Sequence, residues 1–242
     1  MKKSLYIITG CSKGLGKALM DKLIQTPGNQ VVGISRSEMD ENENFLHISL
    51  DLGSTESLIS SLNKIFPSGE FEKIALINNA GWIGEIAPLG KLDPNGIQLI
   101  HATNLIAPAI LMNEFVQQYG ASKAERVVIN ISSGAASKAI DGWSGYCSSK
   151  AALNQLTLVA EEESKLKSLG IKYYALSPGI IDTAMQEDIR SSSQENFSNR
   201  DRFRSYQRNG DLSSPEETAA KVLYMIANFR NFEEVLQDVR EF

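Results

Sequence analysis

Short apolar runs alternate along this chain with longer amphipathic stretches. The apolar runs, which we expect to be strands, span residues 4–9, 30–35, 45–50, 73–78, 125–132, 171–177 and 234–239. The amphipathic stretches, which we expect to be helices, span residues 17–25, 54–66, 97–116, 146–165 and 215–229. Strands that are apolar throughout and separated by helices are typical of a parallel sheet covered on both faces.

This alternation predicts a single doubly wound α/β domain of the Rossmann type over residues 1–242. Because crossovers between parallel strands are right-handed, and because a glycine-rich turn follows the first strand, we expect the strand order 3-2-1-4-5-6-7. A ligand would then bind at the carboxyl ends of strands 1 and 4. The least regular part of the chain, residues 182–212, is polar and rich in Ser, Asn and Arg. It is either a substrate lid, for which we take residues 183–212, or a mobile surface loop.

Composition narrows the classes of partner. The 242 residues carry a formal net charge of −5, and the charges are interspersed without a long run of one sign, so we expect no nucleic-acid partner. No apolar stretch approaches the length of a membrane span, so we expect a cytoplasmic protein that does not enter a membrane. The two cysteines and two histidines lack the spacing of a disulfide framework or a metal site.

A glycine-rich turn after the first strand predicts a dinucleotide site. Glycines at positions 10, 14 and 16 permit a tight strand-to-helix turn and let a diphosphate approach the backbone at the helix N-terminus. Such turns also occur as plain loops, but here a strand precedes the turn and an amphipathic helix follows it. After the fourth strand, the NNAG segment at 78–81 either passes beneath the adenine ribose or is a simple turn.

Two cations indicate which dinucleotide is bound. Arg36 follows the second strand, where a fold that binds NAD usually has a carboxylate, and no acid occurs before Glu38. Lys13 lies in the glycine-rich turn and could reach the same 2′-phosphate. The pattern favours NADPH over NADH, with ordinary surface cations as the alternative. Asp51, after the third strand, could contact the adenine amino group.

Tyr146 and Lys150 are separated by four positions in a predicted helix, so they share one face. A lysine near a phenol favours the phenolate and lowers the tyrosine pKa from its usual value of about 10. The spacing alone is common in solvated surface pairs. Ser133 lies upstream, and its hydroxyl, with the tyrosine proton, would stabilise the charge that builds on a carbonyl oxygen during reduction. Ser132 is the weaker candidate because it lies one residue further from Tyr146.

An ordered set of motifs resembles that of the short-chain dehydrogenase/reductase family. The motifs are TGCSKGLG, NNAG, Asn104 in HATNL, ISSG with Ser133, YCSSK, and SPGIIDT from Ser177 to Thr183. The resemblance covers most of the chain. It implies that Tyr146 donates the proton, that Lys150 binds the nicotinamide ribose and lowers the phenol pKa, and that Ser133 binds the substrate carbonyl.

The resemblance also implies that Asn104 holds a water in the proton relay. Considered without the resemblance, Asn104 could simply cap backbone groups in its helix.

Further along, the segment after Ser177 is similar to that of sepiapterin reductases and related bacterial benzil reductases. In sepiapterin reductases an aspartate near the end of the chain anchors the pterin, and Asp238 either corresponds to it or is a solvated residue on an edge strand. Trp82, Trp143 and Met185 line an aromatic pocket or pack in the core.

We therefore expect an NADPH-dependent carbonyl reductase that acts on a small vicinal dicarbonyl, either an aromatic diketone (benzil to S-benzoin) or a pterin such as sepiapterin. A homodimer or homotetramer is a further implication of the resemblance. The alternatives are a non-catalytic NADP(H)-binding redox sensor and an alcohol dehydrogenase of the same family. The candidate catalytic residues are Tyr146, Lys150, Ser133 and Asn104, and the candidate substrate residues are Ser133, Tyr146 and Asp238. The candidate cofactor residues are Gly10, Ser12, Lys13, Gly14, Leu15, Gly16, Arg36, Asp51, Leu52, Asn79, Ala80, Gly81, Asn104, Tyr146, Lys150, Pro178, Gly179, Ile181 and Thr183.

Overall fold

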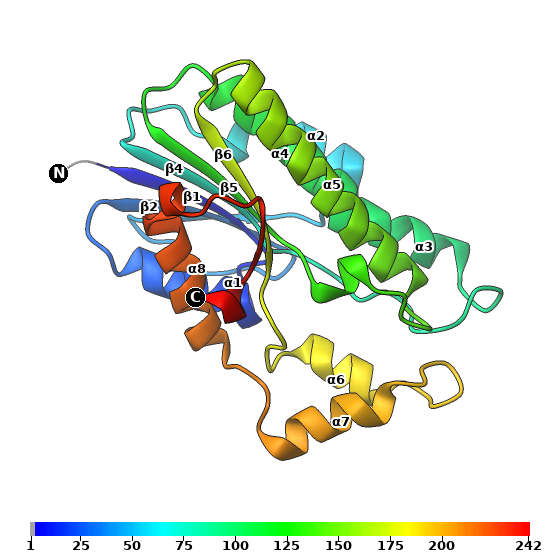
Figure 1. Cartoon of the computed structure of the whole chain (residues 1–242). Helices are drawn as coiled ribbons and strands as arrows, with labels where there is room; N and C mark the ends of the chain where they lie inside the picture. The colour runs from blue at the N-terminus through cyan, green and yellow to red at the C-terminus, as the bar shows by residue number, and fades with distance from the viewer. Residues whose placement is uncertain (1–2) are drawn as a thin grey trace.

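Seven parallel strands form one central sheet in the computed structural model, which describes residues 3–242 (Figure 1). The strands occur in the order β3-β2-β1-β4-β5-β6-β7 across the sheet. Their bounds are β1 Ser4–Thr9, β2 Asn29–Ser35, β3 Phe45–Ser49, β4 Lys73–Asn78, β5 Glu125–Ile131, β6 Ile171–Ser177 and β7 Leu236–Asp238. The predicted fold class and strand order are both confirmed. Because the sheet is parallel, the carboxyl ends of its strands meet along one edge.

Helices cover both faces of the sheet (Figure 1). One face is covered by α1 (Gly14–Ile24) and α8 (Pro215–Ala227), whose buried side chains share one apolar cluster with β1, β5 and β6. The other face is covered by α2 (Thr55–Ile65), α4 (Ala107–Tyr119) and α5 (Ser144–Leu166). Strand interiors that are apolar on both faces are what this two-sided burial requires.

The helix expected over 97–116 is longer in the structure and contains a π-helical turn. It consists of α3 (Pro94–His101), one π-helical turn, η1 (Ala102–Ile106), and α4, which together run without a break from Pro94 to Tyr119. Among the described residues, this is the one helix that is long enough and apolar enough to cross a membrane, judged by length and composition alone. Within its most apolar 18 residues, 44% are buried in the protein. The expectation that no apolar stretch approaches this length is therefore wrong. One such helix is weak evidence for a membrane span, since core helices of soluble proteins pass the same test.

The segment predicted as the least regular is largely helical. It contains α6 (Ala184–Ser191) and α7 (Arg200–Asn209), which pack on each other beyond the carboxyl edge of the sheet (Figure 1). Both helices are mostly polar, although their few apolar positions recur with the helical period, and none of the side chains in α7 is buried. The polar composition of 182–212 therefore reflects two surface helices, and it does not indicate an irregular loop.

Candidate active site

A cavity of about 1260 Å³ lies along the carboxyl edge of the sheet, between the strand ends and the α6–α7 segment. This volume exceeds the roughly 300–1,000 Å³ of common small-molecule pockets. It leaves room for a dinucleotide and a second, smaller molecule. With the exception of Gly16 and Asn104, every candidate residue from the sequence lines this cavity, as do Trp82, Trp143 and Met185.

The glycine-rich turn brings backbone, without side chains, close to the cavity. Gly10 and Gly14 have φ angles of +70° and +54°, in the left-handed region that favours glycine. A Cβ on Gly16 would lie 2.1 Å from the carbonyl oxygen of Gly10 and 2.5 Å from Nδ2 of Asn79. Gly16 therefore does not face a ligand; it permits the close contact between α1 and the turn that shapes the cavity.

Asn79 and Thr9 fix the turn from the neighbouring strand. The Thr9 hydroxyl accepts hydrogen bonds from the backbone N–H groups of Asn79 and Ala80, both at 2.9 Å. In return, the Asn79 side chain donates to the carbonyl oxygens of Thr9 and Gly10, at 2.9 and 3.2 Å. Strands β1 and β4 are thus tied at the point where the sequence predicts the dinucleotide.

The N-terminus of α1 fits an anionic ligand. Lys13 precedes the helix without a side-chain capping hydrogen bond, and the first helical turn holds no acidic residue. Free backbone N–H groups at a helix N-terminus attract phosphate. Lys13 and Arg36 both line this end of the cavity, whereas the Asp51 carboxylate accepts a hydrogen bond from the backbone of Gly53. These groups fit a dinucleotide, with two cations available near its adenosine half.

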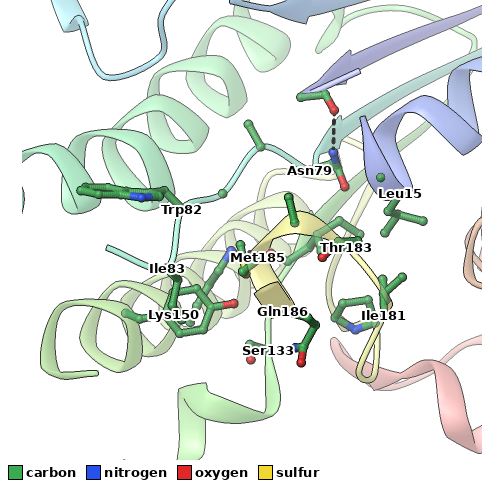
Figure 2. A pocket seen from close by; sticks show the side chains of 18 of the residues that line it. Leu15, Asn79, Trp82, Ile83, Ser133, Lys150, Ile181, Thr183, Met185 and Gln186 are labelled. Carbon is green, nitrogen blue, oxygen red and sulfur yellow. Dashed lines mark hydrogen bonds between the residues drawn. The ribbon is translucent and has the colours of Figure 1, made fainter. Parts of the chain in front are cut away.

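Tyr146 and Lys150 lie one turn apart on α5, and both are buried. The Lys150 Nζ donates a hydrogen bond of 2.7 Å to the carbonyl oxygen of Ile131 at the end of β5. The same nitrogen lies 5.8 Å from the centroid of the Tyr146 ring, and no hydrogen bond joins the two side chains. The backbone of β5 therefore orients the ammonium group within the cavity (Figure 2).

Burial dominates the ionisation of both side chains. It lowers the pKa of Lys150 to about 8, because a buried ammonium group loses its hydration. Burial also raises the pKa of Tyr146, and the hydrogen bond with Ser133 only partly opposes this effect. The sequence predicted that Lys150 would lower the phenol pKa; in the structure the larger effect is burial, and its direction is upward. The phenol is therefore protonated at neutral pH, as a proton donor must be.

Of the two adjacent serines, Ser133 is the one available to a substrate. Ser132 is buried, and its hydroxyl donates to Oδ1 of Asn154. Ser133 precedes the short helix η2 (Gly134–Ser137), and its Oγ accepts a hydrogen bond of 3.1 Å from the backbone N–H of Ala135. Because that bond uses only a lone pair, the Ser133 hydroxyl hydrogen can still be donated. Ser133 also lines the cavity beside Tyr146.

Asn104 lies in the π-helical turn and is fully buried. Its Oδ1 accepts from the backbone N–H of Trp82, and its Nδ2 donates to the carbonyl oxygen of Trp82 and to Oγ of Ser149. The capping alternative from the sequence is therefore not observed, since Asn104 joins η1 to the segment after β4 and to α5. A Cβ on Gly81 would lie 3.7 Å from Oδ1 of Asn104 and 3.5 Å from Nζ of Lys150, so the two side chains flank the same glycine.

Asp238 lines the cavity, but its carboxylate is already paired. Nε and Nη2 of Arg240 donate to the two carboxylate oxygens at 2.8 and 2.5 Å, and the backbone N–H of Arg240 adds a bond of 3.0 Å. The Arg240 guanidinium holds the pKa of Asp238 below its usual range, with a smaller contribution from Lys138. Arg240 and Lys138 also line the cavity, and the sequence singled out neither of them.

An aromatic cluster joins Tyr146 to the segment after α6. The Trp143 ring stacks on Phe197 at 5.2 Å and meets the Tyr146 ring edge-on at 5.7 Å. Phe197 is completely buried, in a cluster that also contains Ile189 of α6. Trp143 therefore both packs in this cluster and lines the cavity, so the two roles weighed for it from the sequence occur together.

A carboxylate fastens the same segment to the chain that precedes α5. Asp141 accepts hydrogen bonds from the backbone N–H and the hydroxyl of Ser198, at 2.7 and 2.8 Å, and from Nδ2 of Asn199 at 3.2 Å. These bonds hold the pKa of Asp141 below its usual value. The sequence did not identify Asp141, because neither its position nor its neighbours form a recognisable pattern.

Comparison with known proteins agrees with this geometry. The model of the short chain dehydrogenase family matches residues 4–194. The chain is 36% identical over 226 residues to a benzil reductase ((S)-benzoin forming) of Bacillus subtilis, covering 92% of this chain and 93% of the relative. It is 31% identical over 248 residues to a sepiapterin reductase of Meriones unguiculatus, covering 92% and 91%. The crystal structure of the KRED1-Pglu enzyme superimposes with a TM-score of 0.79 at 26% identity, covering 93% of this chain and 95% of that one.

Family membership implies a nicotinamide dinucleotide as cofactor and a small molecule as substrate. The cavity, with its glycine-rich turn and its buried Tyr146 and Lys150, meets the structural requirements of that chemistry. The chain belongs to the short-chain dehydrogenase family of oxidoreductases.

Proposed function

We propose that this protein is an NADPH-dependent carbonyl reductase that reduces one carbonyl group of a vicinal diketone, with benzil to (S)-benzoin as the specific reaction. The observation that carries the proposal is the convergence of Ser133, Tyr146 and Lys150 on one cavity next to a phosphate-binding turn. A non-catalytic redox sensor would not need a buried phenol and ammonium in this arrangement.

The cofactor would supply a hydride to the carbonyl carbon. Negative charge then builds on the carbonyl oxygen, where the Ser133 hydroxyl donates a hydrogen bond and the Tyr146 phenol donates its proton. The positive charge of Lys150 stabilises the phenolate that Tyr146 becomes. The Ile131 carbonyl oxygen keeps the ammonium group in place. The Asn104 side chain is hydrogen-bonded to the backbone of Trp82 and to the Ser149 hydroxyl, so it holds the chain next to Gly81 in place. Asn104 would also support a relay of protons through water.

The preference for NADPH rests on charge. Arg36 follows β2 and Lys13 precedes α1, and both line the cavity at the same end. A guanidinium group binds a phosphate with two parallel hydrogen bonds, and a nearby ammonium group adds a second positive charge. Asp51, which accepts a hydrogen bond from the backbone of Gly53, would contact the adenine amino group in this proposal.

The choice of a vicinal diketone rests on two kinds of support. The names of the relatives from Bacillus describe reduction of benzil, and the sepiapterin reductases are more distant relatives. In addition, Trp82, Trp143, Ile83 and Met185 give the cavity an aromatic and apolar wall, which suits phenyl rings. Asp238 is less suited to anchor a pterin, because Arg240 already occupies its carboxylate.

Three further expectations belong to the same proposal. Residues 183–212, with α6 and α7, would act as the substrate lid, because several of their side chains line the cavity and they lie outside the sheet. The protein would act in the cytoplasm. It would assemble as a homodimer or homotetramer, for which exposed apolar side chains on α5, such as Leu158 and Val159, offer a surface.

The test is NADPH consumption with a panel of benzil, 1-phenyl-1,2-propanedione, sepiapterin and simple monoketones, followed by chiral analysis of the products. We expect the highest kcat/KM with the aromatic diketones and the S configuration in benzoin. Faster turnover of sepiapterin would replace the proposed substrate with a pterin. Turnover of none of these carbonyls would contradict the reductase assignment.

A further inference from the structure

Gln186 is a buried polar side chain in the wall of the cavity that the proposed mechanism does not use. It lies on α6, three residues after Thr183, and it is 8% exposed. Its Oε1 atom is buried without a hydrogen-bond partner, and its amide nitrogen forms no hydrogen bond with any described residue. Nε2 is not among the buried atoms without a partner, so the donor end of the amide is the end that is open to the cavity, without a partner in the protein.

The backbone of Gln186 is held firmly although its side chain is not. Its N–H donates to the carbonyl oxygen of Thr183 at 2.9 Å, which starts the first turn of α6. On the same helix, Ile189 is buried in the aromatic cluster with Trp143 and Phe197. The preceding residue, Met185, lines the cavity as well, so this turn of α6 forms part of the cavity wall (Figure 2). The amide is thus presented on a fixed support, as a binding group should be.

The cavity already contains groups for one substrate oxygen. Ser133 and Tyr146 each have a hydroxyl hydrogen to donate to the carbonyl that is reduced. The side-chain amide of Gln186 adds two N–H donors that are otherwise unused, while its Oε1 atom is buried away from the cavity. A vicinal dicarbonyl has a second oxygen on the adjacent carbon atom, and this oxygen accepts hydrogen bonds only. A monoketone has no such atom and would leave the Gln186 amide unpaired.

We propose that Gln186 determines specificity by donating a hydrogen bond to the second oxygen of a vicinal dicarbonyl substrate. This inference rests on the proposed function, because it assigns a role within the same reaction. A site built to hydrogen-bond a substrate group rejects the analogue that lacks the group, since a buried polar atom then stays unpaired. The amide therefore favours diketones over monoketones of the same shape.

Two of the remaining polar groups in the wall are less suited to this role. Asp238 is paired with Arg240, and Lys138 is exposed to solvent. Trp143 also has a buried N–H without a partner, but its ring is fixed between Phe197 and Tyr146 by stacking and edge contacts. Gln186 differs in having a flexible side chain whose N–H donors are open to the cavity.

The test compares benzil with deoxybenzoin, which has the same carbon skeleton but lacks one carbonyl oxygen. Replacing Gln186 by Leu removes the donors and keeps a side chain of similar size. In this variant we expect kcat/KM for benzil to fall about tenfold to a hundredfold, while the value for deoxybenzoin changes by less than about twofold. Where deoxybenzoin is not turned over, its competitive inhibition constant against benzil replaces kcat/KM. The dissociation constant of NADPH, measured by fluorescence, should not change.

A second variant and a matched control complete the design. Gln186→Glu keeps the shape but replaces the donors with a carboxylate that repels a carbonyl oxygen, so it should lose activity on benzil at least as strongly as the leucine variant. Gln207→Leu makes the same chemical change at an exposed position of the same segment, outside the cavity, and should match the wild-type protein on both substrates.

Each other outcome contradicts the inference in a distinct way. An equal fall with both ketones would make Gln186 a structural residue of α6, and a weaker affinity for NADPH would assign it to the cofactor. Wild-type kinetics in Gln186→Leu would show that the amide does not act in catalysis. If the wild-type protein reduces both ketones, the variants test the role of Gln186 alone. If the wild-type protein reduces neither ketone, the proposed function is contradicted, and the inference about Gln186 is contradicted with it.

Discussion

The burial of Lys150 predicts that reduction slows as the pH rises through about 8. Lys150 is 3% exposed, and the one hydrogen bond of its ammonium group joins it to the carbonyl oxygen of Ile131. Burial disfavours the charged form, which is why the pKa lies below that of an ordinary lysine. The proposed mechanism needs the charged form, because an uncharged amine does not stabilise the Tyr146 phenolate. Activity should therefore be full below this pKa and decline above it.

The size of the effect follows from the pKa. A group with a pKa of about 8 is about nine-tenths charged at pH 7, half charged at pH 8 and about one-tenth charged at pH 9. We therefore expect about a tenfold decrease in activity between pH 7 and pH 9. Burial raises the pKa of Tyr146 instead, so the phenol stays protonated over this interval and does not contribute to the decline.

The assay is kcat/KM for NADPH between pH 6 and pH 10, at a fixed diketone concentration well below its KM and at constant ionic strength. This ratio reports the ionisation of the free enzyme, which is the state described by the structure. Lys138→Met serves as the control, because Lys138 is an exposed lysine at the same cavity, and the variant should retain the decline near pH 8. Lys150→Arg keeps a charge at all these pH values, so its remaining activity should show no decline there. A wild-type profile that is flat to pH 10 would refute this account of Lys150.

Three further predictions address the cofactor, the lid and the stability of the fold. Arg36→Asp should lower the ratio of kcat/KM for NADPH to that for NADH by tenfold or more, and an unchanged ratio would contradict the role given to this cation. Asp141→Ala removes the acceptor of three hydrogen bonds from the proposed lid, so KM for the diketone should rise severalfold while KM for NADPH is unchanged; equal effects on both would place the change elsewhere. Phe197→Ala should lower the free energy of unfolding by about 3–5 kcal/mol in urea denaturation, because the ring is fully buried, and a loss under about 1 kcal/mol would contradict its anchoring role.

Much of the architecture could be predicted from hydrophobic patterning. Strands that are buried on both faces are apolar at every position, and the amphipathic stretches between them have the period of a helix, so order and topology follow from general rules. Patterning does not reveal the π-helical turn at Ala102–Ile106, because apolar residues are frequent on both sides of it and hide the shift in helical phase that one extra residue causes. The α6–α7 segment was missed for another reason: its helices are short and mostly polar, and they bury few side chains.

The positions of the candidate site residues could be predicted where a motif determines them. Their pKa values and hydrogen-bond partners could not, because these depend on the surrounding structure. Tyr146 and Lys150 were placed correctly on one face of a helix. The direction of the Tyr146 pKa was not, because the sequence reveals a neighbouring charge but not the loss of water around the phenol. Asp238 was placed in the cavity, yet its pairing with Arg240 depends on the local backbone after β7.

Gln186 could not be identified from sequence at all. Glutamines are common in surface helices, and only its burial together with the absence of a hydrogen-bond partner distinguishes this one. The same holds for Asp141, whose three hydrogen bonds come from residues far along the chain. Such long-range partners are decided by tertiary packing, which no local pattern records.

The central claim is that the Tyr146 hydroxyl donates the proton in an NADPH-dependent reduction. The most direct test is the turnover of benzil and the binding of NADPH by Tyr146→Phe, which removes one oxygen atom and preserves the ring that packs on Trp143. We expect kcat to fall by a factor of about 10² to 10⁴, with the dissociation constant of NADPH unchanged. Near-wild-type turnover in this variant would contradict the mechanism.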